Sequence, residues 1–359
     1  MKILVTRTDR LGDLVLSLPA IDLLAAAHPD WEIHVMTAPA TAPLMTAHPG
    51  VTRVWTWRDD LPAASVRALA GELRSEEFDA AVMLQYRREL ASLLRRVGIA
   101  RRHGPHSRLS SWFLLNHGVR QSRSARDEHE AVYNCELAAR LADVRDADCA
   151  LPRLHPGADA RAVGRAFRAE RAADARTVAF VHPGSGGSAL DWEPARFATL
   201  ANDLATREGW RVFVTGAGAD SEAVGAVSAG LDPAVDVLLD AFGLRDFAGV
   251  LAAGDVFVGP STGPLHMAAA LDLATVGLYP PVRTMSPRRW GPRGRWCRVL
   301  VPEVMCPENR FCAGERCAHH NCMYLVAAET VSDATVILAR ERRMGLADDE
   351  PVPEKESLS

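Results

Sequence analysis

The chain has 359 residues, of which 48% are hydrophobic and 24% are charged, and its formal net charge is −4 at pH 7. This length is enough for two domains of ordinary size. The small negative charge gives no general affinity for nucleic acid, and no uncharged apolar run reaches the ~18 residues that a membrane span needs. The N-terminal apolar run is interrupted by Arg7, Asp9 and Arg10, unlike a signal peptide, so we expect a cytoplasmic protein.

The first half of the chain alternates between short apolar runs, which predict strands, and stretches with helical spacing of apolar residues. The expected strands are 2–6, 32–37, 53–57 and 80–84, and the expected helices are 14–27, 61–73 and 128–141. This alternation predicts a parallel sheet with right-handed crossovers.

The alternation stops between Asp143 and Asp174, where Pro152, Pro156 and a charged helical piece predict a connection between domains. It then resumes. The expected strands are 177–181, 211–215, 235–239, 255–258 and 274–278, and the expected helices are 194–208, 244–253, 264–271 and 328–343. The tail after Leu346 is acidic, contains proline and is expected to be disordered.

We therefore predict an α/β protein with two doubly wound, Rossmann-like parallel-sheet domains that face each other across a cleft. The expected divisions are an N-terminal domain over 1–155, a connection over 156–175, a C-terminal domain over 176–330, and a final helix and tail over 331–359. Because open α/β sheets bind ligands beyond the carboxyl ends of their strands, each domain would hold one substrate.

Two strand-to-helix turns in the second half suit a diphosphate. One is Gly259-Pro-Ser-Thr-Gly263, before an Ala-rich helix, and the other is His182-Pro-Gly-Ser-Gly-Gly-Ser188. Unpaired N–H groups at a helix start attract anions, and Gly263 permits close approach of the backbone. Either turn alone is equally well explained as a plain connection, but the pair indicates a nucleotide-sugar site.

An acidic residue follows the first expected strand. Asp13 closes the segment Asp9-Arg-Leu-Gly-Asp13 at a helix start, where a carboxylate either stabilises the helix dipole or serves as a general base. Inverting glycosyl transfer needs one carboxylate to take the proton of the attacking hydroxyl, while N–H donors and cations stabilise the departing diphosphate.

Arginine supplies nearly all the positive charge, because lysine occurs only at Lys2 and Lys355. Ten arginines lie between Arg87 and Arg126. They form either a solvated surface or a basic rim for an anionic acceptor, since guanidinium groups suit phosphate and carboxylate. The candidate acceptor-binding residues are Arg10, Arg87 and Arg88.

Seven cysteines are present, of which Cys135 and Cys149 are expected to be isolated thiols. The other five cluster with two histidines: Cys297, Cys306, Cys312, Cys317, Cys322, His319 and His320. A cytoplasmic chain keeps thiols reduced, and no C-x2-C pair marks a zinc site. The spacing favours a loop of buried or redox-active thiols over a metal site, and we expect no cofactor.

The ordered set of motifs resembles glycosyltransferase family 9, which includes the ADP-heptose:lipopolysaccharide heptosyltransferases. The opening, Ile3 to Ala20, is similar to that family's N-terminus, and His182-Pro-Gly-Ser with Trp192-Glu-Pro is similar to its donor loop. Three further segments resemble later motifs of the family: Gly218-Ala-Asp-Ser-Glu222, Gly259 to Ala270, and Cys322-Met-Tyr-Leu-Val326. The resemblance covers about residues 1 to 340.

The resemblance implies the GT-B fold and a metal-independent, inverting transfer of heptose or another sugar from a nucleotide-sugar donor, ADP-linked, to an envelope glycolipid of lipopolysaccharide type. Asp13 would be the general base. Glu222 would contact the ribose or base, and Phe242 would lie near the base. The full implied donor set is Ser185, Gly186, Glu222, Phe242, Ser261, Thr262, Gly263 and His266. An anionic glycolipid acceptor also implies peripheral contact with the cytoplasmic face of the inner membrane.

Two positions depart from the family's pattern. Leu190 stands where the family has a lysine, and Ser261 stands where it has an acid. These changes remove one cation and one carboxylate expected at the diphosphate and sugar. A replacement cation could come from Arg283, Arg288 or Arg289.

Other functions stay open. The two departures are compatible with a nucleotide- or glycan-binding protein that has lost catalysis, and the architecture also suits a nucleotide-sugar epimerase. Asp146-Ala-Asp148 is interpreted as a solvated loop. Gly216-Ala-Gly218 hints at a dinucleotide fingerprint, but it lacks the third glycine, and we expect no partner acid after the next strand.

Overall fold

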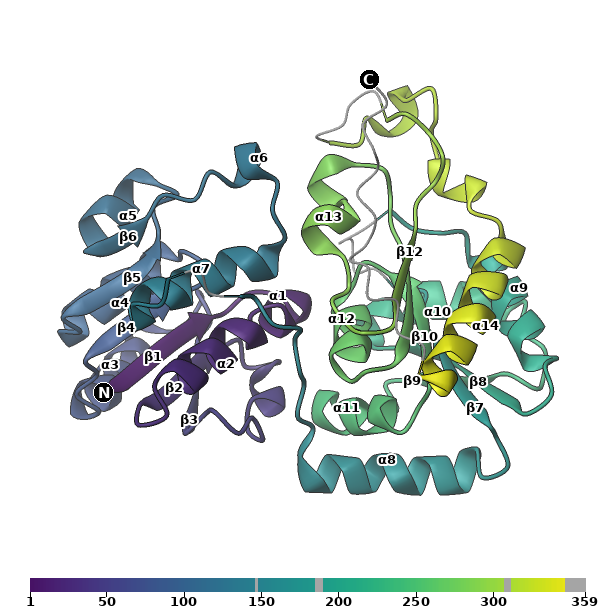
Figure 1. Cartoon of the computed structure of the whole chain (residues 1–359), viewed down its shortest axis with the longest axis horizontal. Helices are drawn as coiled ribbons and strands as arrows, with labels where there is room; N and C mark the ends of the chain where they lie inside the picture. The colour runs from purple at the N-terminus through teal and green to yellow at the C-terminus, as the bar shows by residue number, and fades with distance from the viewer. Residues whose placement is uncertain (146–147, 185–189, 307–310, 346–359) are drawn as a thin grey trace. The chain divides into compact units, whose positions relative to one another are not determined.

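The computed structural model describes residues 1–145, 148–184, 190–306 and 311–345. The chain divides into two compact units, Met1–Gly157 and Ala158–Ser359, each built on one six-stranded parallel sheet (Figure 1). The predicted α/β class with two doubly wound sheets is confirmed.

The first unit has the strand order β3-β2-β1-β4-β5-β6. Its strands are β1 (Lys2–Arg7), β2 (Glu32–Thr37), β3 (Arg53–Thr56), β4 (Ala80–Met83), β5 (Arg101–Pro105) and β6 (His117–Val119). Its helices are α1 (Leu11–Val15), α2 (Leu18–Ala27), α3 (Ala63–Ser75), α4 (Arg88–Val97), α5 (Leu109–Leu114), α6 (Arg123–Arg126) and α7 (Glu130–Ala142).

Helices cover both faces of this sheet. Side chains from α3 and α4, such as Leu73 and Leu90, pack with Leu4 and Met83 on one face. Helices α2 and α7 lie side by side, and Tyr133 of α7 is fully buried. The strands are buried on both faces, as expected for a parallel sheet between helical layers.

The second unit has the strand order β12-β11-β10-β7-β8-β9. Its strands are β7 (Thr177–Val181), β8 (Trp210–Gly216), β9 (Asp236–Leu239), β10 (Val256–Pro260), β11 (Ala274–Leu278) and β12 (Cys297–Leu300). Its helices are α8 (Gly157–Arg171), α9 (Pro194–Ala205), α10 (Ser221–Ser228), α11 (Leu244–Ala252), α12 (Gly263–Ala270), α13 (Pro287–Trp290) and α14 (Ala328–Met344). Counted from its own first strand, each sheet has the order 3-2-1-4-5-6 of dinucleotide-binding folds.

Helix α8 packs on the second unit, although residues 156–175 were expected to form a separate connection. Its Phe167 ring lies 4.9 Å from Phe213 and 6.3 Å from Phe180, which are buried side chains of the sheet. A Cβ at Gly164 would lie 1.9 Å from the carbonyl oxygen of Gly249, and a Cβ at Gly249 would lie 1.8 Å from that of Ala160. The backbones of α8 and α11 are therefore in direct contact.

The expected helix over 14–27 is instead two helices, α1 and α2, separated by Leu16 and Ser17. Pro19 lies in the first turn of α2, where the missing N–H of proline is tolerated. The Ser17 hydroxyl donates to the carbonyl oxygen of Asp13 at 2.7 Å, which closes the end of α1. Strands β5, β6 and β12 were not predicted; β5 and β6 are short and carry Arg, His, Gly and Pro rather than an apolar run.

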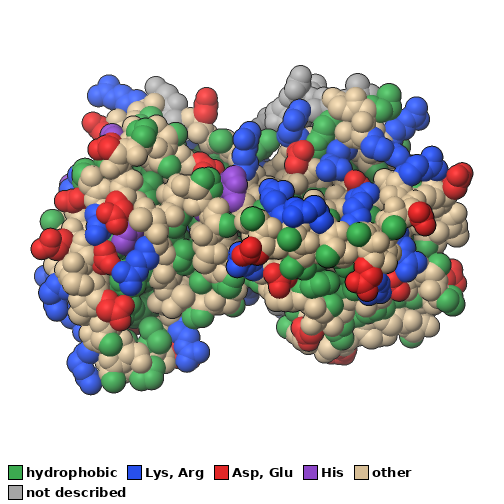
Figure 2. Space-filling model, turned by 90° about the horizontal axis from the view of Figure 1, so that it is seen from below, with side chains coloured by type: hydrophobic (Ala, Val, Ile, Leu, Met, Phe, Trp, Pro, Cys, Tyr) green, Lys and Arg blue, Asp and Glu red, His purple; other side chains and the backbone are tan. Residues whose placement is uncertain are grey.

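No helix among the described residues is both long enough and apolar enough to cross a membrane. On the face shown in Figure 2, basic and acidic side chains are interspersed. That face therefore offers no broad surface of a single charge.

Candidate active site

The strand order of the first unit reverses between β1 and β4, which are adjacent and parallel. The segments that follow these two strands therefore start side by side, and the N–H of Leu84 donates to the carbonyl oxygen of Thr6 at 3.0 Å. One segment leads into Asp9 and Asp13, and the other into Arg87 and Arg88. Ligands of open α/β sheets bind at such a reversal, so the sequence motif around Asp13 lies where a substrate site is expected.

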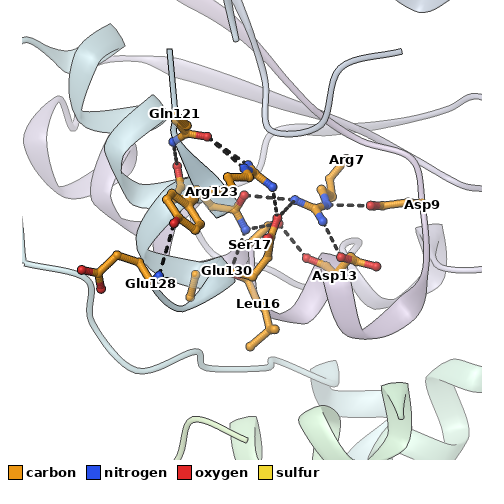
Figure 3. Close-up of polar contacts among 12 residues, drawn as sticks. Arg7, Asp9, Asp13, Leu16, Ser17, Gln121, Arg123, Glu128 and Glu130 are labelled. Atoms are coloured by element: carbon orange, nitrogen blue, oxygen red, sulfur yellow. Dashed lines mark hydrogen bonds and ion pairs between the residues drawn. The ribbon is translucent and has the colours of Figure 1, made fainter. Parts of the chain in front are cut away.

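Arg7, the last residue of β1, is the centre of a buried ion-pair cluster (Figure 3). Its side chain is only 3% exposed. Its Nε lies 2.7 Å from Asp9 Oδ1, its Nη2 lies 2.5 Å from Asp13 Oδ1, and its Nη1 lies 3.3 Å from Glu130 Oε1. Each of the three guanidinium nitrogen atoms thus contacts a different carboxylate.

Helix α7 supplies the support of this cluster. Glu130, at its first turn, also accepts a hydrogen bond from Arg123 Nη1 at 2.7 Å. Asn134, one turn later, accepts from Arg7 Nη1 at 3.0 Å and donates to the Leu16 carbonyl oxygen at 3.2 Å and to Ser17 Oγ at 3.1 Å. The amide of Asn134 therefore ties Arg7 to the turn that follows Asp13.

Burial raises the pKa of the Asp13 carboxyl to about 6, because the charged form loses contact with water. The Arg7 guanidinium lowers this pKa, whereas Asp9 and Glu130 raise it. For Arg7, burial opposes the charged form, but the three carboxylates outweigh it and its pKa is raised. Asp13 is thus ionised near neutral pH and basic enough to accept a proton.

The three arginines expected at the acceptor lie in the first unit. Arg10 is exposed at the N-cap of α1, and Arg88 is exposed at the start of α4. Arg87 is half-buried; its Nε donates to Gln85 Oε1 at 2.9 Å and its Nη1 lies 3.3 Å from Asp59 Oδ2. All three follow β1 or β4, the two strands at the reversal.

In the second unit the strand order reverses between β10 and β7. The two turns that were expected to bind a diphosphate follow these adjacent strands. The N–H of His182 donates to the Val258 carbonyl oxygen at 2.8 Å, and a Cβ at Gly259 would lie 2.9 Å from the His182 carbonyl oxygen. The structure therefore brings the described parts of both turns together.

The turn after β10 ends in the N-terminus of α12. Thr262 is the N-cap, yet its side chain makes no capping hydrogen bond, and its buried Oγ1 has no hydrogen-bond partner among the described residues. Gly263 opens the helix, and His266 is 4% exposed one turn later. A buried hydroxyl without a partner beside unpaired N–H groups suits a ligand with several acceptor oxygens, such as a phosphate.

His182 and Asp220 line the turn after β7. His182 Nδ1 lies 3.0 Å from Thr215 Oγ1, and burial lowers the pKa of His182 against the attraction of Asp220. A Cβ at Gly184 would lie 2.0 Å from Asp220 Oδ1, so a larger residue there would have to displace the Asp220 side chain. Ser185 and Gly186, which were expected at the diphosphate, lie outside the described residues.

The residues expected at the nucleoside follow β8 and β9. Glu222 is exposed in the first turn of α10. Phe242 is half-buried, and its ring packs edge-on against Phe167 at 5.8 Å. The expectation that no acid follows the next strand is wrong, because Asp240 directly follows β9 and accepts a hydrogen bond from the Gly218 N–H at 2.7 Å.

At both positions that depart from the family pattern, the side chain contacts neighbouring residues of the second unit. Leu190 packs against the hydrophobic core of the second unit. Ser261 forms a hydrogen bond with Tyr279, whose pKa is raised by burial in spite of that bond. Neither position therefore offers a charge. Arg283 lies in a single 3-10 turn after β11, and Arg288 and Arg289 lie in α13.

Several members of the Arg7 cluster were not predicted as site residues: Arg7, Asp9, Arg123, Glu130 and Asn134. The available signal was Arg7 itself, a charged residue at the carboxyl end of a strand that the sequence predicts from the apolar run Ile3 to Val5. Cys135 and Cys149 are also not isolated, since their sulfur atoms lie 2.8 Å apart.

Comparisons with known proteins show the family of the chain. Residues 66–310 match the family described as glycosyltransferase family 9 (heptosyltransferase). A protein of Haemophilus influenzae named putative glycosyltransferase is 31% identical over 298 residues, covering 81% of this chain and 86% of the relative. Lipopolysaccharide heptosyltransferase 1 of Pseudomonas aeruginosa is 28% identical over 292 residues, covering 78% of this chain and 79% of that protein.

Among solved structures, the ADP-heptose lps heptosyltransferase II of E. coli has a TM-score of 0.80 at 24% identity, covering 96% of this chain and all of that one. That likeness confirms the predicted fold. Together with the family match over more than half of the chain, these findings show that the chain belongs to glycosyltransferase family 9 and is a glycosyltransferase.

Proposed function

We propose that this enzyme transfers a heptose from ADP-heptose to an anionic glycolipid of lipopolysaccharide type, with inversion at the anomeric carbon and Asp13 as general base. The observation that carries the proposal is the Asp13 carboxyl, which is held by Arg7 at the strand-order reversal and has a pKa of about 6. A carboxylate with such a pKa is largely ionised at neutral pH and still takes up a proton readily.

In the proposed reaction, Asp13 accepts the proton of an acceptor hydroxyl while the hydroxyl oxygen forms a bond to the anomeric carbon of the donor sugar. The bond between that carbon and the diphosphate oxygen breaks, and the electron pair leaves with ADP. Attack from the face opposite the diphosphate inverts the configuration. No metal ion takes part in these steps.

The second unit would bind the donor. Thr262 Oγ1 and the N–H groups at the start of α12 are donors for the diphosphate, and the turn at Gly184 lies beside them through β7 and β10. Ser185, Gly186, Ser261 and His266 would complete the contacts to the diphosphate and sugar. Glu222 and Phe242, which follow β8 and β9, would contact the ribose and the base.

The choice of ADP-heptose rests on relatives, because the E. coli structure is named for that donor. Leu190 and Ser261 supply no charge here, so the donor site needs another cation. Arg283, Arg288 and Arg289, which follow β11, are the candidates. An arginine would hold a diphosphate through a planar pair of N–H groups rather than a single ammonium.

The acceptor would bind to the first unit at Arg10, Arg87 and Arg88. Between Ala80 and Arg126 the sequence contains ten arginines and a single acid, Glu89. In the same region α5 exposes three large apolar side chains, with Leu109, Trp112 and Phe113 at 78%, 56% and 70% exposure. Cationic groups beside exposed aromatic and aliphatic side chains suit the surface of an anionic membrane, where a glycolipid acceptor resides.

Helix α5 is joined to the segment that carries Arg87. The Tyr86 hydroxyl donates to Ser110 Oγ at 2.7 Å, and Arg95 Nη1 donates to the Phe113 carbonyl oxygen at 3.3 Å. A membrane contact through α5 would therefore act on the same segment that would bind the acceptor. This supports an enzyme that works peripherally at the cytoplasmic face of the inner membrane.

The test is an assay of the full chain with ADP-heptose and a heptose-free lipopolysaccharide core. We expect a heptose mass increment on the acceptor and stoichiometric ADP, both absent for Asp13→Ala. Calorimetry with ADP, UDP, GDP and NAD separates the donor class, with ADP expected to bind selectively. A preference for UDP or GDP would keep glycosyl transfer but exclude ADP-heptose as the donor. An isomerised sugar nucleotide formed without acceptor would show that the enzyme is an epimerase and not a transferase.

A further inference from the structure

Two cysteines of the first unit lie in contact, although the sequence predicts isolated thiols. The sulfur atoms of Cys135 and Cys149 lie 2.8 Å apart, and the two residues are 14 positions apart in the chain. This separation leaves no room for another atom between the two sulfurs. A disulfide bond requires them to approach to about 2.0 Å, which is a small further movement. The proposed glycosyl transfer uses neither thiol, so the pair calls for a separate explanation.

The end of α7 brings the two cysteines together. Cys135 lies in the middle of this helix and is 2% exposed. The helix ends at Asp143, whose φ of 54° is left-handed, and the N–H groups of Asp143 and Val144 both donate to the Ala139 carbonyl oxygen. A left-handed residue with such hydrogen bonds ends a helix and turns the chain back. The segment after Asp143 therefore returns toward α7, where Cys149 meets Cys135.

Cys149 is more shielded than the residues around it. In the described parts of this segment, 143–145 and 148–150, every residue except Cys149 is exposed. Cys149 itself is half-buried, so a small oxidant in solution has access to its sulfur. Cys135 is almost closed to solvent. The arrangement therefore favours Cys149 as the thiol that reacts first and Cys135 as the thiol that completes the bond.

We propose that Cys135 and Cys149 form a reversible disulfide bond in response to oxidation. The oxidant would be a low-molecular-weight disulfide, of which glutathione disulfide is the probe used below. A cytoplasmic location is compatible with such a bond, because disulfides in that compartment are usually transient and redox-sensing. The proposal does not depend on the proposed glycosyl transfer, since neither cysteine belongs to the Asp13 cluster.

The reaction consists of two thiol–disulfide exchanges. In the first, the Cys149 thiolate attacks one sulfur of the oxidant, the S–S bond of the oxidant breaks, and its other half leaves as a thiolate and takes up a proton. In the second, the Cys135 thiolate attacks Cys149 Sγ, the mixed disulfide breaks, and the second half leaves in the same way. The two cysteines lose two electrons and two protons, and the oxidant gains them as two thiols.

The bond would stabilise the folded first unit. A crosslink between two cysteines restricts the unfolded chain, so the folded state gains relative stability. Helix α7 also carries Glu130 and Asn134 of the Arg7 cluster, and Asn134 directly precedes Cys135. Oxidation would therefore fix the helix that supports this cluster to the segment that leads into the second unit.

The test maps disulfides in the full-length protein after equilibration with mixtures of glutathione and glutathione disulfide, acid quenching and alkylation. Trypsin cuts after Arg126, Arg140, Arg145 and Arg153. The two cysteines therefore fall in separate peptides, 127–140 and 146–153, which only a disulfide joins. We expect the joined peptide in more than half of the chains under the most oxidising mixture, and its loss when dithiothreitol is added to the folded protein.

Cys149→Ser should abolish the joined peptide. The matched control, Cys297→Ser, removes a thiol of β12 in the second unit and should keep it. Oxidation should also raise the Tm of the wild type more than that of Cys149→Ser. The difference between these two proteins isolates the effect of this bond from any reaction of the other cysteines.

Absence of the joined peptide at every ratio of the two glutathione forms would overturn the proposal. A glutathione adduct that persists on Cys149 while Cys135 stays a thiol would also overturn it, and so would Cys135 joined mainly to a cysteine of the second unit. A bond that dithiothreitol leaves intact in the folded protein would contradict its reversibility. All of these outcomes are read from the wild type, so the result does not depend on how a variant folds.

Discussion

Arg7 Nη2 lies 2.5 Å from Asp13 Oδ1, in an ion pair of which 3% of the arginine side chain and 15% of the aspartate side chain are exposed. The same contacts join two guanidinium groups, Arg7 and Arg123, to three carboxylates, Asp9, Asp13 and Glu130. Burial raises the pKa of the Asp13 carboxyl most, and the neighbouring carboxylates of Asp9 and Glu130 raise it further. The cluster thus positions Asp13 and makes it basic at the same time.

Replacing Asp13 by asparagine should abolish proton acceptance while the shape of the side chain is kept. We expect kcat to fall by about 10²- to 10⁴-fold, the usual contribution of a general base. The rate of sugar transfer under saturating substrates is the measurement. Asp30→Asn, an exposed acid after α2, is the control and should retain the wild-type rate; a kcat for Asp13→Asn above a tenth of the wild type would remove Asp13 from the role.

The rate should depend on pH through Asp13. Since its pKa is about 6, kcat/KM should fall about tenfold per unit below pH 6 and level off above pH 7. The folded-state pKa also exceeds the value of about 3.9 for a free aspartate. The folded protein therefore binds this proton more tightly, and the contribution to stability is lost as pH rises through 6.

Urea unfolding at pH 5 and pH 8 measures that second effect. The free energy of unfolding of the wild type, minus that of Asp13→Asn, should be larger at pH 5 than at pH 8. No difference between the two pH values, together with a flat rate profile, would show that the carboxyl titrates as if it were exposed.

Arg7→Met should destabilise the first unit, because three carboxylates would lose their buried cation. Breaking a buried ion pair from one side costs about 3–5 kcal/mol. Arg123→Met is the matched control: it removes the more exposed partner of Glu130, at 25% exposure, and should cost about 1 kcal/mol or less. Chemical denaturation of both variants compares them, and equal costs would argue against Arg7 as the centre of the cluster.

Thr262→Val should weaken nucleotide binding without harm to the fold. The Thr262 hydroxyl is buried without a partner in the described chain, so valine removes an unmet polar group. We expect ADP affinity to fall about 10- to 150-fold, equivalent to one hydrogen bond to a charged group at about 1.5–3 kcal/mol. Thr275→Val is the control, because that buried hydroxyl donates to Leu273; it should lower thermal stability and leave ADP affinity unchanged.

Trp112→Ser/Phe113→Ser should reduce binding to anionic vesicles and spare transfer to a short-chain acceptor in solution. Sedimentation with vesicles of phosphatidylglycerol, against vesicles of phosphatidylcholine, provides the readout. Ile337→Ser removes a comparably exposed apolar side chain from α14 and is the control. If the wild type, the double variant and Ile337→Ser sediment alike, α5 is not the membrane contact.

The sequence was sufficient for the central strands and for the motifs beside them. Strands β7, β11 and β2 were predicted at their observed bounds, because they are rich in apolar residues and almost wholly buried. Strands at the edges of the sheets were harder to predict. Strand β6 has three residues, His117-Gly-Val119, and its pairing with β5 comes from the sheet rather than from its own composition.

The Arg7 cluster could not be predicted for a different reason. Asp9 and Asp13 are close to Arg7 in sequence, but Glu130 and Asn134 belong to a helix more than a hundred residues later. Only the packing of α7 beside α2 brings them together.

The contact between Gly164 and Gly249 also bears on how this sequence can change over generations. Each position excludes even a methyl group because the opposite backbone is already there. A second change cannot compensate for the first, since neither residue has a side chain left to shorten. Glycine is therefore expected at both positions or at neither. Without the two glycines, α8 would have to move away from α11, and another element would have to cover that face of the sheet.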